Sequence, residues 1–456
     1  ALFGREKQQT ITEVEQIVNR LEVIKTNHAF THTFLSFFYT HLGFTSFESN
    51  LLRDLVIMRI VEPCSKLRSL ELIKEYFSIS YGRTNMHKKL SEIIKQKETF
   101  EKIAVLYAKK HLGFDFSIVF YDVTTLYFES FKEDKEEFRK PGFSKDNKAN
   151  QPQIVIGLIV TREGFPVSYD VFAGNTFEGK TFIPTITKFK NTYGIKNLTI
   201  VADAAMISYP NIQSLITNNL SYIVGGRMAS LKQEEIEEIG QKLSAKEESL
   251  KKLKKKDGLS ERIETERGTL ICDFSFKRYL KDKREMDKQI TKAKRLLEEN
   301  EGAKRIKFIK NKDDEKTEQV LNTDLIEKTK ILLGIKGYYT NLVDETDKTI
   351  IDHYHNLWKV EKAFRIAKSD LEARPVFHHK KENIEAHILI VFLGLCISKS
   401  IELLTRYSIQ KVKHIIWSVL DVKFRDTPTG KIFIKRTNTT ENPMVKFLEK
   451  FSVVDK

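Results

Sequence analysis

Three acidic residues in the 456-residue chain interrupt apolar segments and are the first candidates for chemistry. Asp122 follows the strand-like run 117–121, and Asp203 follows a similar run over 198–202. Glu361 falls on the apolar face of a predicted helix, where inward positions recur every three or four residues. A lone carboxylate on such a face costs free energy unless a cation or a hydrogen-bond donor meets it. We therefore expect the three acids to share a site for divalent metal ions. The inward positions of the predicted helix are Tyr354, Leu357, Trp358, Glu361, Phe364, Lys368 and Leu371.

Carboxylates carried by three separate elements suit reactions at a phosphodiester. Two divalent ions about 4 Å apart can activate an oxygen nucleophile and stabilise the leaving oxygen. Mg²⁺ and Mn²⁺ prefer carboxylate oxygens, and Mg²⁺ keeps several of its waters, so few protein ligands are needed. Histidine ligands are not expected: His378 and His379 are adjacent and cannot chelate from one helix face, and His387 lies on an apolar helical segment.

Each acid also has an ordinary structural explanation. An aspartate after a strand is most often a turn or helix cap, and Asp122 could form such a turn with the two threonines that follow it closely. Glu361 could form a helix salt bridge with Lys368 or Arg365. These explanations must hold independently at three positions, whereas one metal site accounts for all three, and we favour the shared site.

The residues around the last acid resemble a known family pattern. Tyr354, Glu361 and Lys368 match Tyr-x2-Arg-x3-Glu-x6-Lys, with Leu357 at the arginine position, and Arg365 could replace part of the arginine's function. The run Tyr-Asp-Val-Thr-Thr over 121–125 matches the strand that carries the first acid. The chain thus resembles the DDE transposases of bacterial insertion sequences, whose catalytic core is RNase H-like.

The resemblance implies a role for each candidate residue. Asp122 would bridge two Mg²⁺ (or Mn²⁺) ions, and Asp203 and Glu361 would each hold one of them. The reaction would cut element ends and join the freed 3′-hydroxyls to target DNA. The implied partners are double-stranded DNA, as terminal inverted repeats and as target, and a second copy in a homodimer on DNA. Contacts to DNA phosphates are expected from Tyr354, Arg365 and Lys368, and less strongly from Lys145 and Lys148.

The pattern of predicted strands and helices indicates an α/β fold, with a mixed sheet and flanking helices. The resemblance implies that this sheet is RNase H-like. A charged insertion interrupts the sheet, and a helical N-terminal region precedes it. Helical spacing predicts helices over 12–25, 47–61 and 91–111. From residue 116 the pattern predicts three strands, the last two forming a hairpin, then helix, strand, helix and strand. The predicted divisions are 1–112 (helical DNA-binding region), 113–226 (first part of the catalytic core), 227–336 (insertion), 337–410 (second part of the core, with the Glu361 helix) and 411–456 (C-terminal region, with a short hairpin and a last helix).

The charge of the chain favours a polyanionic partner. The formal net charge is +15 and the isoelectric point is about 9.3, as expected for a protein that binds nucleic acid. Residues 228–318 are dense in lysine and glutamate and are interpreted as a solvated helical pair. Within this stretch, DNA phosphate contacts are expected from Lys277, Arg278, Lys281 and Arg284.

Cysteine usage and hydropathy bear on the compartment. Three widely separated cysteines argue against a disulfide framework or a zinc site and fit a reducing environment. The apolar run 388–397 is too short to span a bilayer, so we expect no membrane association. The protein is expected in the bacterial cytoplasm, associated with the nucleoid when bound to DNA. A start at Ala1 without methionine suggests processing or missing N-terminal residues.

Three other functions stay open at the level of sequence. The chain could be a domesticated, catalytically inactive DNA-binding protein derived from a transposase. It could be an RNase H-like nuclease that never joins strands. The lysine- and glutamate-rich stretch could instead form a coiled-coil scaffold, although Gly240, Gly258 and Gly268 interrupt its heptads.

Overall fold

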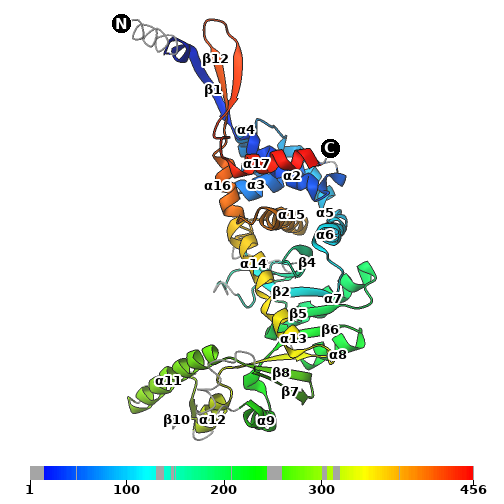
Figure 1. Cartoon of the computed structure of the whole chain (residues 1–456), viewed down its shortest axis with the longest axis vertical. Helices are drawn as coiled ribbons and strands as arrows, with labels where there is room; N and C mark the ends of the chain where they lie inside the picture. The colour runs from blue at the N-terminus through cyan, green and yellow to red at the C-terminus, as the bar shows by residue number, and fades with distance from the viewer. Residues whose placement is uncertain are drawn as a thin grey trace, which may run out of the picture. The chain divides into compact units, whose positions relative to one another are not determined.

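The computed structural model is described for residues 15–47, 49–129, 138–144, 148, 150–206, 208–243, 259–299, 306–311, 319–378 and 380–454. By their contacts, the residues form two compact units (Figure 1). Unit 1 comprises Ala1–Asp115, Val123–Thr176 and Lys359–Lys456, and unit 2 comprises Phe116–Asp122 and Phe177–Trp358. This division does not follow the linear segments of the sequence, since strand β2 (Ile118–Tyr127) contributes to both units.

Unit 1 is built around one apolar helix, α15 (Lys381–Thr405). The helix is long and apolar enough to cross a membrane, but 78% of its most apolar window is buried inside the protein, as expected of a core helix. Helices from the N-terminal region pack against it, among them α3, which begins where the Ser49 hydroxyl accepts a hydrogen bond from the Leu52 amide. The helical N-terminal region is therefore confirmed as a feature of the fold. The helices of unit 1 besides α15 are α2 (Ala29–His41), η1 (Phe44–Ser46), α3 (Asn50–Val61), α4 (Lys66–Phe77), α5 (Arg83–Ile94), α6 (Lys97–Leu112), α14 (Trp358–Arg365), η4 (Ile366–Asp370), α16 (Ile409–Trp417) and α17 (Pro443–Val454).

A β-hairpin at one edge of the large sheet packs against α15 in unit 1. Strands β3 (Gln153–Val160) and β4 (Pro166–Ala173) form the expected antiparallel hairpin, and β3 also neighbours β2. The side chains of β3 are buried along the whole strand, and Tyr169 on β4 packs against Phe392 of α15 with ring centroids 5.0 Å apart. This contact fixes the hairpin on the core helix.

A separate three-stranded sheet joins the two ends of the chain. Its strands are β1 (Leu21–Asn27), β12 (Asp421–Asp426) and β13 (Ile432–Arg436), in the order β1-β12-β13 and antiparallel throughout. The helix expected over 12–25 is therefore wrong beyond residue 20, because residues 21–27 pair with a strand that lies about 400 positions later. The short hairpin expected near the C-terminus is confirmed as β12 and β13.

Unit 2 contains a mixed sheet in the order β2-β5-β6-β11-β8-β7. Strands β2, β5 (Thr199–Ala202) and β6 (Ser221–Gly226) are parallel, and β11 (Ile335–Thr340) runs antiparallel to β6. Counted with β3 and β4, the sheet has eight strands, so the predicted mixed α/β sheet with flanking helices is confirmed. The helices around the strands of unit 2 are α7 (Glu178–Tyr193), η2 (Ala204–Met206), α8 (Tyr209–Thr217), η3 (Met228–Ser230) and α13 (Asp347–His355).

The charged insertion is not the helical pair that its composition suggested. It adds the hairpin β7 (Leu259–Thr265) and β8 (Gly268–Phe274), and β8 extends the sheet by pairing with β11. Gly268, at the start of β8, has φ of +101°, a conformation that glycine adopts without strain. The other part of the insertion packs around a small apolar core, formed by Met286, Ala293, Phe308, Ile326 and Leu333. The remaining elements of the insertion are α9 (Gln233–Leu243), α11 (Phe276–Glu298), β9 (Ile309–Asn311), β10 (Gln319–Leu321) and α12 (Thr323–Ile331).

Candidate active site

Asp122 and Asp203 follow neighbouring residues of two parallel strands. Tyr121 of β2 is in register with Ala202 of β5, and each aspartate is the next residue along its own strand. Asp122 does not end its strand as expected, since β2 continues to Tyr127; Asp203 follows the last residue of β5, as predicted. Asp122 is half-buried and Asp203 is exposed. The parallel register thus brings the two acids to the same level of the sheet in unit 2.

The carboxylate of Asp203 is held by its own turn and by one tyrosine. Its Oδ1 accepts a hydrogen bond from the amide of Ala204 at 2.6 Å and one from the Tyr354 hydroxyl at 3.4 Å. The Arg227 guanidinium donates from Nε to the Ala204 carbonyl oxygen at 3.1 Å, which braces the turn after Asp203. These contacts fix the carboxylate orientation before any ligand binds.

Tyr354 is buried, although we expected it to contact DNA phosphates. Its ring packs against Tyr338, with centroids 4.7 Å apart, and the Lys336 ammonium lies 4.6 Å from the centroid of the Tyr354 ring. Burial also raises the pKa of the neighbouring Tyr338 to about 12, so that hydroxyl stays protonated. Burial of this ring disagrees with the expected phosphate contact, and the Tyr354 hydroxyl lies instead against the carboxylate of Asp203.

Gly225 is a site residue that the sequence did not single out. It lies on β6, and a Cβ atom at this position would be 2.4 Å from the Tyr354 hydroxyl oxygen and 3.1 Å from the Ala204 amide nitrogen. The space for the tyrosine hydroxyl therefore depends on a missing side chain. A glycine within a strand often marks such a close approach, which is the one sequence signal that could have indicated it.

Glu361 does not lie on a buried helical stripe. It is exposed on α14 in unit 1, and Trp358, another expected inward residue, is 52% exposed. The cause is a break in the helix: the amides of Asn356 and Leu357 donate to carbonyls three residues earlier, His353 and Tyr354, which tightens the turn and shifts the phase. The inward face of α14 is instead Val360, Ala363 and Phe364, so Glu361 carries no desolvation cost.

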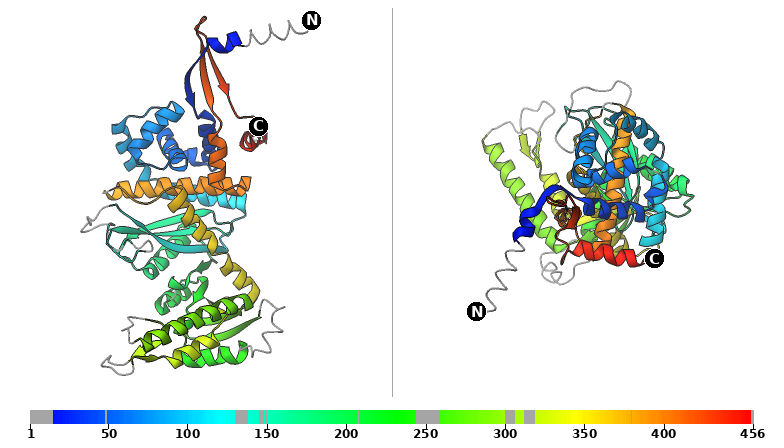
Figure 2. Two further views of the ribbon diagram at one scale, coloured as in Figure 1. Left: turned by 90° about the vertical axis from the view of Figure 1, so that its left-hand side faces the viewer. Right: turned by 90° about the horizontal axis from the view of Figure 1, so that it is seen from above.

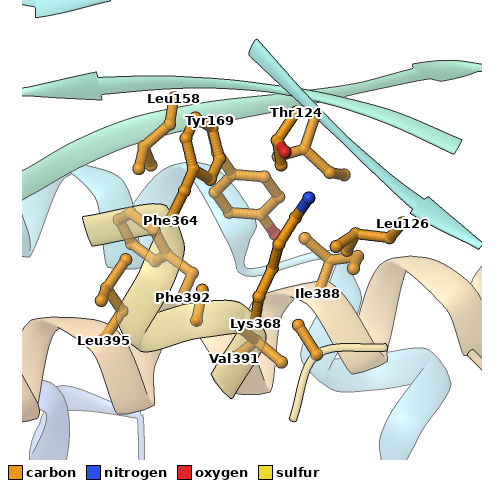
Figure 3. A pocket seen from close by; sticks show the side chains of 13 residues that line it. Thr124, Leu126, Leu158, Tyr169, Phe364, Lys368, Ile388, Val391, Phe392 and Leu395 are labelled. Atoms are coloured by element: carbon orange, nitrogen blue, oxygen red, sulfur yellow. The ribbon is translucent and has the colours of Figure 1, made fainter. Parts of the chain in front are cut away.

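Arg365 and Lys368 differ in their surroundings. Arg365 is exposed in the last turn of α14. Lys368 lies on the following π-helix η4, and its aliphatic stem lines an apolar cavity of about 40 Å³ in unit 1. In Figure 3 its side chain passes Phe392 and Ile388 and extends towards Thr124 on β2. The apolar walls of the cavity therefore restrict the conformations of the Lys368 side chain and the positions that its ammonium group can take.

The remaining predicted DNA contacts divide into exposed and structural residues. Lys277, Lys281 and Arg284 are exposed on one face of α11, but Arg278 turns inward and donates to the carbonyl oxygens of Asp273 and Gly334, each at 3.5 Å. The DNA contact predicted for Arg278 is thus replaced by a structural one. Lys148 is exposed, with its ammonium 5.5 Å from the centroid of the Tyr127 ring. Lys145 lies outside the described residues.

His387, expected to be a packed and hydrogen-bonded residue, has such surroundings. His387 is buried and its Nε2 is 3.0 Å from the Ala373 carbonyl oxygen. Burial, reinforced by the charges of Arg59 and Lys66, holds the pKa of His387 well below its usual range. His378 faces the buried ammonium of Lys66 at 2.6 Å, and His379 lies outside the described residues.

The donor atoms that line up at β2 and β5 suit hard cations. Asp122 and Asp203 offer carboxylate oxygens only, the ligand type that Mg²⁺ and Mn²⁺ prefer, and Asp203 faces solvent where waters can complete a coordination shell. Within the described ranges, no group of three or more His, Cys, Asp and Glu side chains is gathered closely enough to hold a metal ion. The two aspartates of unit 2 thus offer oxygen ligands of the type that such a cation would need.

Comparisons with known proteins identify the family of the chain. A search of the curated proteins finds no match. Among solved structures, the chain is similar to the cryo-EM structure of the piggyBac transposase synaptic complex with hairpin DNA (TM-score 0.40, 11% identity, 86% of this chain and 70% of that chain). It is also similar to the Mos1 transposase paired-end complex with left transposon end (TM-score 0.18, 13% identity, 41% of this chain and 57% of that chain). The family described as "Transposase DDE domain" matches residues 113–397, more than half of the chain and the segment that holds all three acids. The protein therefore belongs to the DDE transposase family.

Proposed function

We propose that this protein is a DNA transposase that cuts the ends of an element and joins the freed 3′-hydroxyls to target DNA. The observation that carries the proposal is the register of β2 and β5, which sets Asp122 and Asp203 side by side in a chain of this family. Glu361, exposed on α14, is proposed as the third acid. The element is proposed to be a bacterial insertion sequence, on which the protein acts in the cytoplasm at the nucleoid.

The three carboxylates would hold two Mg²⁺ (or Mn²⁺) ions, which supply charge stabilisation at the phosphorus and an activated oxygen nucleophile. In the first step a water oxygen bonds to phosphorus, and the bond from phosphorus to the 3′ oxygen of the element end breaks. In the second step that 3′-hydroxyl attacks a target phosphodiester and displaces another 3′ oxygen. Both steps exchange one oxygen on phosphorus for another, so the same residues can serve both.

Tyr354 and Gly225 contribute by orienting Asp203. The Tyr354 hydroxyl donates to Oδ1, which leaves Oδ2 as the oxygen without that bond and directs it to a ligand. The close approach of Tyr354 to Gly225 limits the positions that the hydroxyl can adopt. Both residues therefore lower the reorganisation needed at the carboxylate when charge develops on the substrate.

DNA binding is proposed for the exposed cations. Lys277, Lys281 and Arg284 follow each other at intervals of four and three residues on α11, and Lys288, Lys292 and Arg295 continue the same exposed face. We call these six residues the α11 basic row. Contacts of this kind are with phosphates and are insensitive to base sequence. Arg365, Lys368 and Lys148 are proposed as phosphate contacts near the cleaved bond.

The test is cleavage of a duplex that carries the terminal inverted repeat found beside the coding region, in Mg²⁺ or Mn²⁺. Asp122→Ala and Asp203→Ala should each lower the cleavage rate more than about a hundredfold, the effect of removing one preorganised contribution to charge stabilisation. Asp352→Ala is the matched control, because this acid is exposed on α13 and has no role in the proposed chemistry. Equal cleavage by wild type and Asp122→Ala would show that the proposed chemistry is wrong.

A target plasmid in the same reaction separates the transposase from its alternatives. Joined products support strand transfer, whereas cleaved ends without joining identify a nuclease. Binding of the repeat without cleavage by wild type identifies a DNA-binding protein derived from a transposase.

A further inference from the structure

The sheet β1-β12-β13, which we call the arm, carries exposed apolar side chains on its edge strand β13. Every residue of β13 is exposed, and Ile432, Phe433 and Ile434 are 52%, 51% and 69% exposed. In Figures 1 and 2 the arm extends away from the helices of unit 1. A sheet edge of this kind is a template for pairing with another strand.

The two edges of the arm differ in a way that points to β13. The other edge, β1, has a register shift between Val23 and Lys25, and α4 packs against it. The register of β13 with β12 is continuous, and residues 432–436 contain no proline. Bulges, prolines, covering helices and charged side chains are the usual protections of an edge. Within the described part of the chain β13 has none of the first three, and its charges, Lys435 and Arg436, are confined to its C-terminal end. The β13 edge is therefore available for pairing.

The charges of the arm favour a protein strand over DNA as its occupant. Three arginines that could bind phosphates each form an ion pair with a carboxylate within the arm. The pairs are Arg436 with Asp421 at 2.6 Å, Arg20 with Asp426 at 3.3 Å and Arg425 with Glu22 at 3.6 Å. These ion pairs hold the arm together, and what remains at the β13 edge is the apolar run Ile432–Ile434, flanked by the exposed Lys431 and Lys435.

We propose that β13 pairs antiparallel with β13 of a second copy of this chain. Complete overlap of two identical five-residue strands places Ile434 opposite Ile434 of the second copy, on the two-fold axis. Phe433 then faces Lys435 across the pair, and Ile432 faces Arg436. Each cation stands opposite an apolar or aromatic side chain, which its aliphatic stem can cover.

The neighbouring register is less favourable for a clear reason. A pairing centred on Phe433 sets Lys431 opposite Lys435, and like charges directly opposite each other destabilise a strand pair. The paired strands bury far less than the roughly 1,200–2,000 Å² of a stable interface, so the dimer is weak when free and is strengthened when two copies bind the same DNA assembly. This surface shares no residue with the acids, and the inference does not depend on cleavage.

The decisive experiment is oxidative cross-linking of the full chain at high protein concentration. Ile434→Cys should give a disulfide-linked dimer, because residues directly opposite in a strand pair have Cβ atoms about 4.5–5.5 Å apart, close to disulfide range. Ile432→Cys is the matched control: it is similarly exposed, but its two copies would lie about 13 Å apart along the strands, at 3.3 Å per residue. Oxidation of the wild-type protein measures any background cross-linking through its own cysteines, Cys64, Cys272 and Cys396.

Sedimentation provides the second measurement. Ile434→Lys should reduce the fraction of dimer at least several-fold, while Val23→Lys on the β1 edge should leave it unchanged. The proposal is overturned if Ile434→Cys stays monomeric on oxidation, or if Ile432→Cys links equally well. Loss of DNA affinity in Ile434→Lys without cross-linking of Ile434→Cys would assign the arm to DNA instead. Cross-linking with no DNA cleavage would leave the pairing intact and count only against the proposed chemistry.

Discussion

At the scale of single residues, the site depends on a side chain that is absent. Gly225 leaves room for the Tyr354 hydroxyl, and that hydroxyl in turn contacts Asp203. Asp203 itself is exposed, so its orientation comes from these neighbours and from the Ala204 amide and not from burial. Asp203, Tyr354 and Gly225 are therefore coupled: a larger side chain at position 225 would move the Tyr354 hydroxyl and, through it, the Asp203 carboxylate.

Gly225→Ala tests this coupling. The added methyl group would displace Tyr354, and we expect a loss of about 1–3 kcal/mol in the free energy of unfolding, typical of overpacking. DNA cleavage should fall at least tenfold. Denaturant unfolding and the cleavage assay measure the two effects.

Tyr354→Phe provides the control for Gly225→Ala, because it removes the oxygen that the methyl group would strike. The double variant Gly225→Ala/Tyr354→Phe should recover most of the lost stability, while its cleavage rate should stay at the level of Tyr354→Phe alone. Additive losses of stability in the double variant would contradict the proposed contact.

At the scale of elements, α11 combines two faces with separate tasks. Met286, Ala293 and Leu296 are buried and hold the helix on the rest of the insertion, and the opposite face carries the α11 basic row. Arg278 illustrates the limit of reasoning from charge alone, since its guanidinium turns to the Gly334 carbonyl. The position of a cation around the helix, and not the density of the charged run, decides whether it can meet DNA.

Lys281→Ala combined with Arg284→Ala tests the α11 basic row. Each lost phosphate contact lowers the slope of log K against log salt concentration by about 0.9, so the double variant should lose nearly 2 from the slope. Binding to specific and unrelated duplexes should weaken by a similar factor. Lys294→Ala, an exposed lysine outside the row, should leave the slope unchanged. An unaltered slope in the double variant would remove α11 from the DNA interface.

Local patterns were sufficient for some of the elements and not for others. Alternating and continuous apolar runs predicted β3 to β6. The aspartates after residues 121 and 202 were grouped because each follows an apolar run and one metal site accounts for both, and the parallel register of β2 and β5 then places them at the same level. Glu361 was placed on a buried face because the tight turn at Asn356 and Leu357 leaves no mark in the spacing of apolar residues. Strand β1 was interpreted as helix because its partner, β12, lies at the other end of the sequence. The contribution of Gly225 depends on a neighbour from α13 and could not be anticipated from β6 alone.

At the scale of the whole molecule, the insertion is part of the sheet and not an appendage. Strand β8 pairs with β11 along six residues, from Ile335 opposite Phe274 to Thr340 opposite Thr269. Removing the insertion would turn β11 into an edge and uncover the buried ring of Tyr339. The stability of unit 2 therefore depends on a segment whose composition resembles a solvated surface.

Deletion of residues 228–334, with Arg227 joined to Ile335 by a flexible linker, should lower the melting temperature by several degrees or more. A loss of about 1 kcal/mol already shifts the melting temperature by roughly 2–4 °C in a domain of 150–250 residues. Thermal unfolding and soluble yield measure the effect. An unchanged melting temperature would mean that the insertion folds independently of the sheet.

The pairing of β1 with β12 has a consequence for how the protein is made. Residues 21–27 leave the ribosome well before their partner strand is synthesised, since Arg20 is 406 positions from Asp426. The arm can close only after β12 has been made. A polypeptide that stops before Asp421, through a premature stop codon or a frameshift, would lack β12 and β13 and could not pair through the proposed surface.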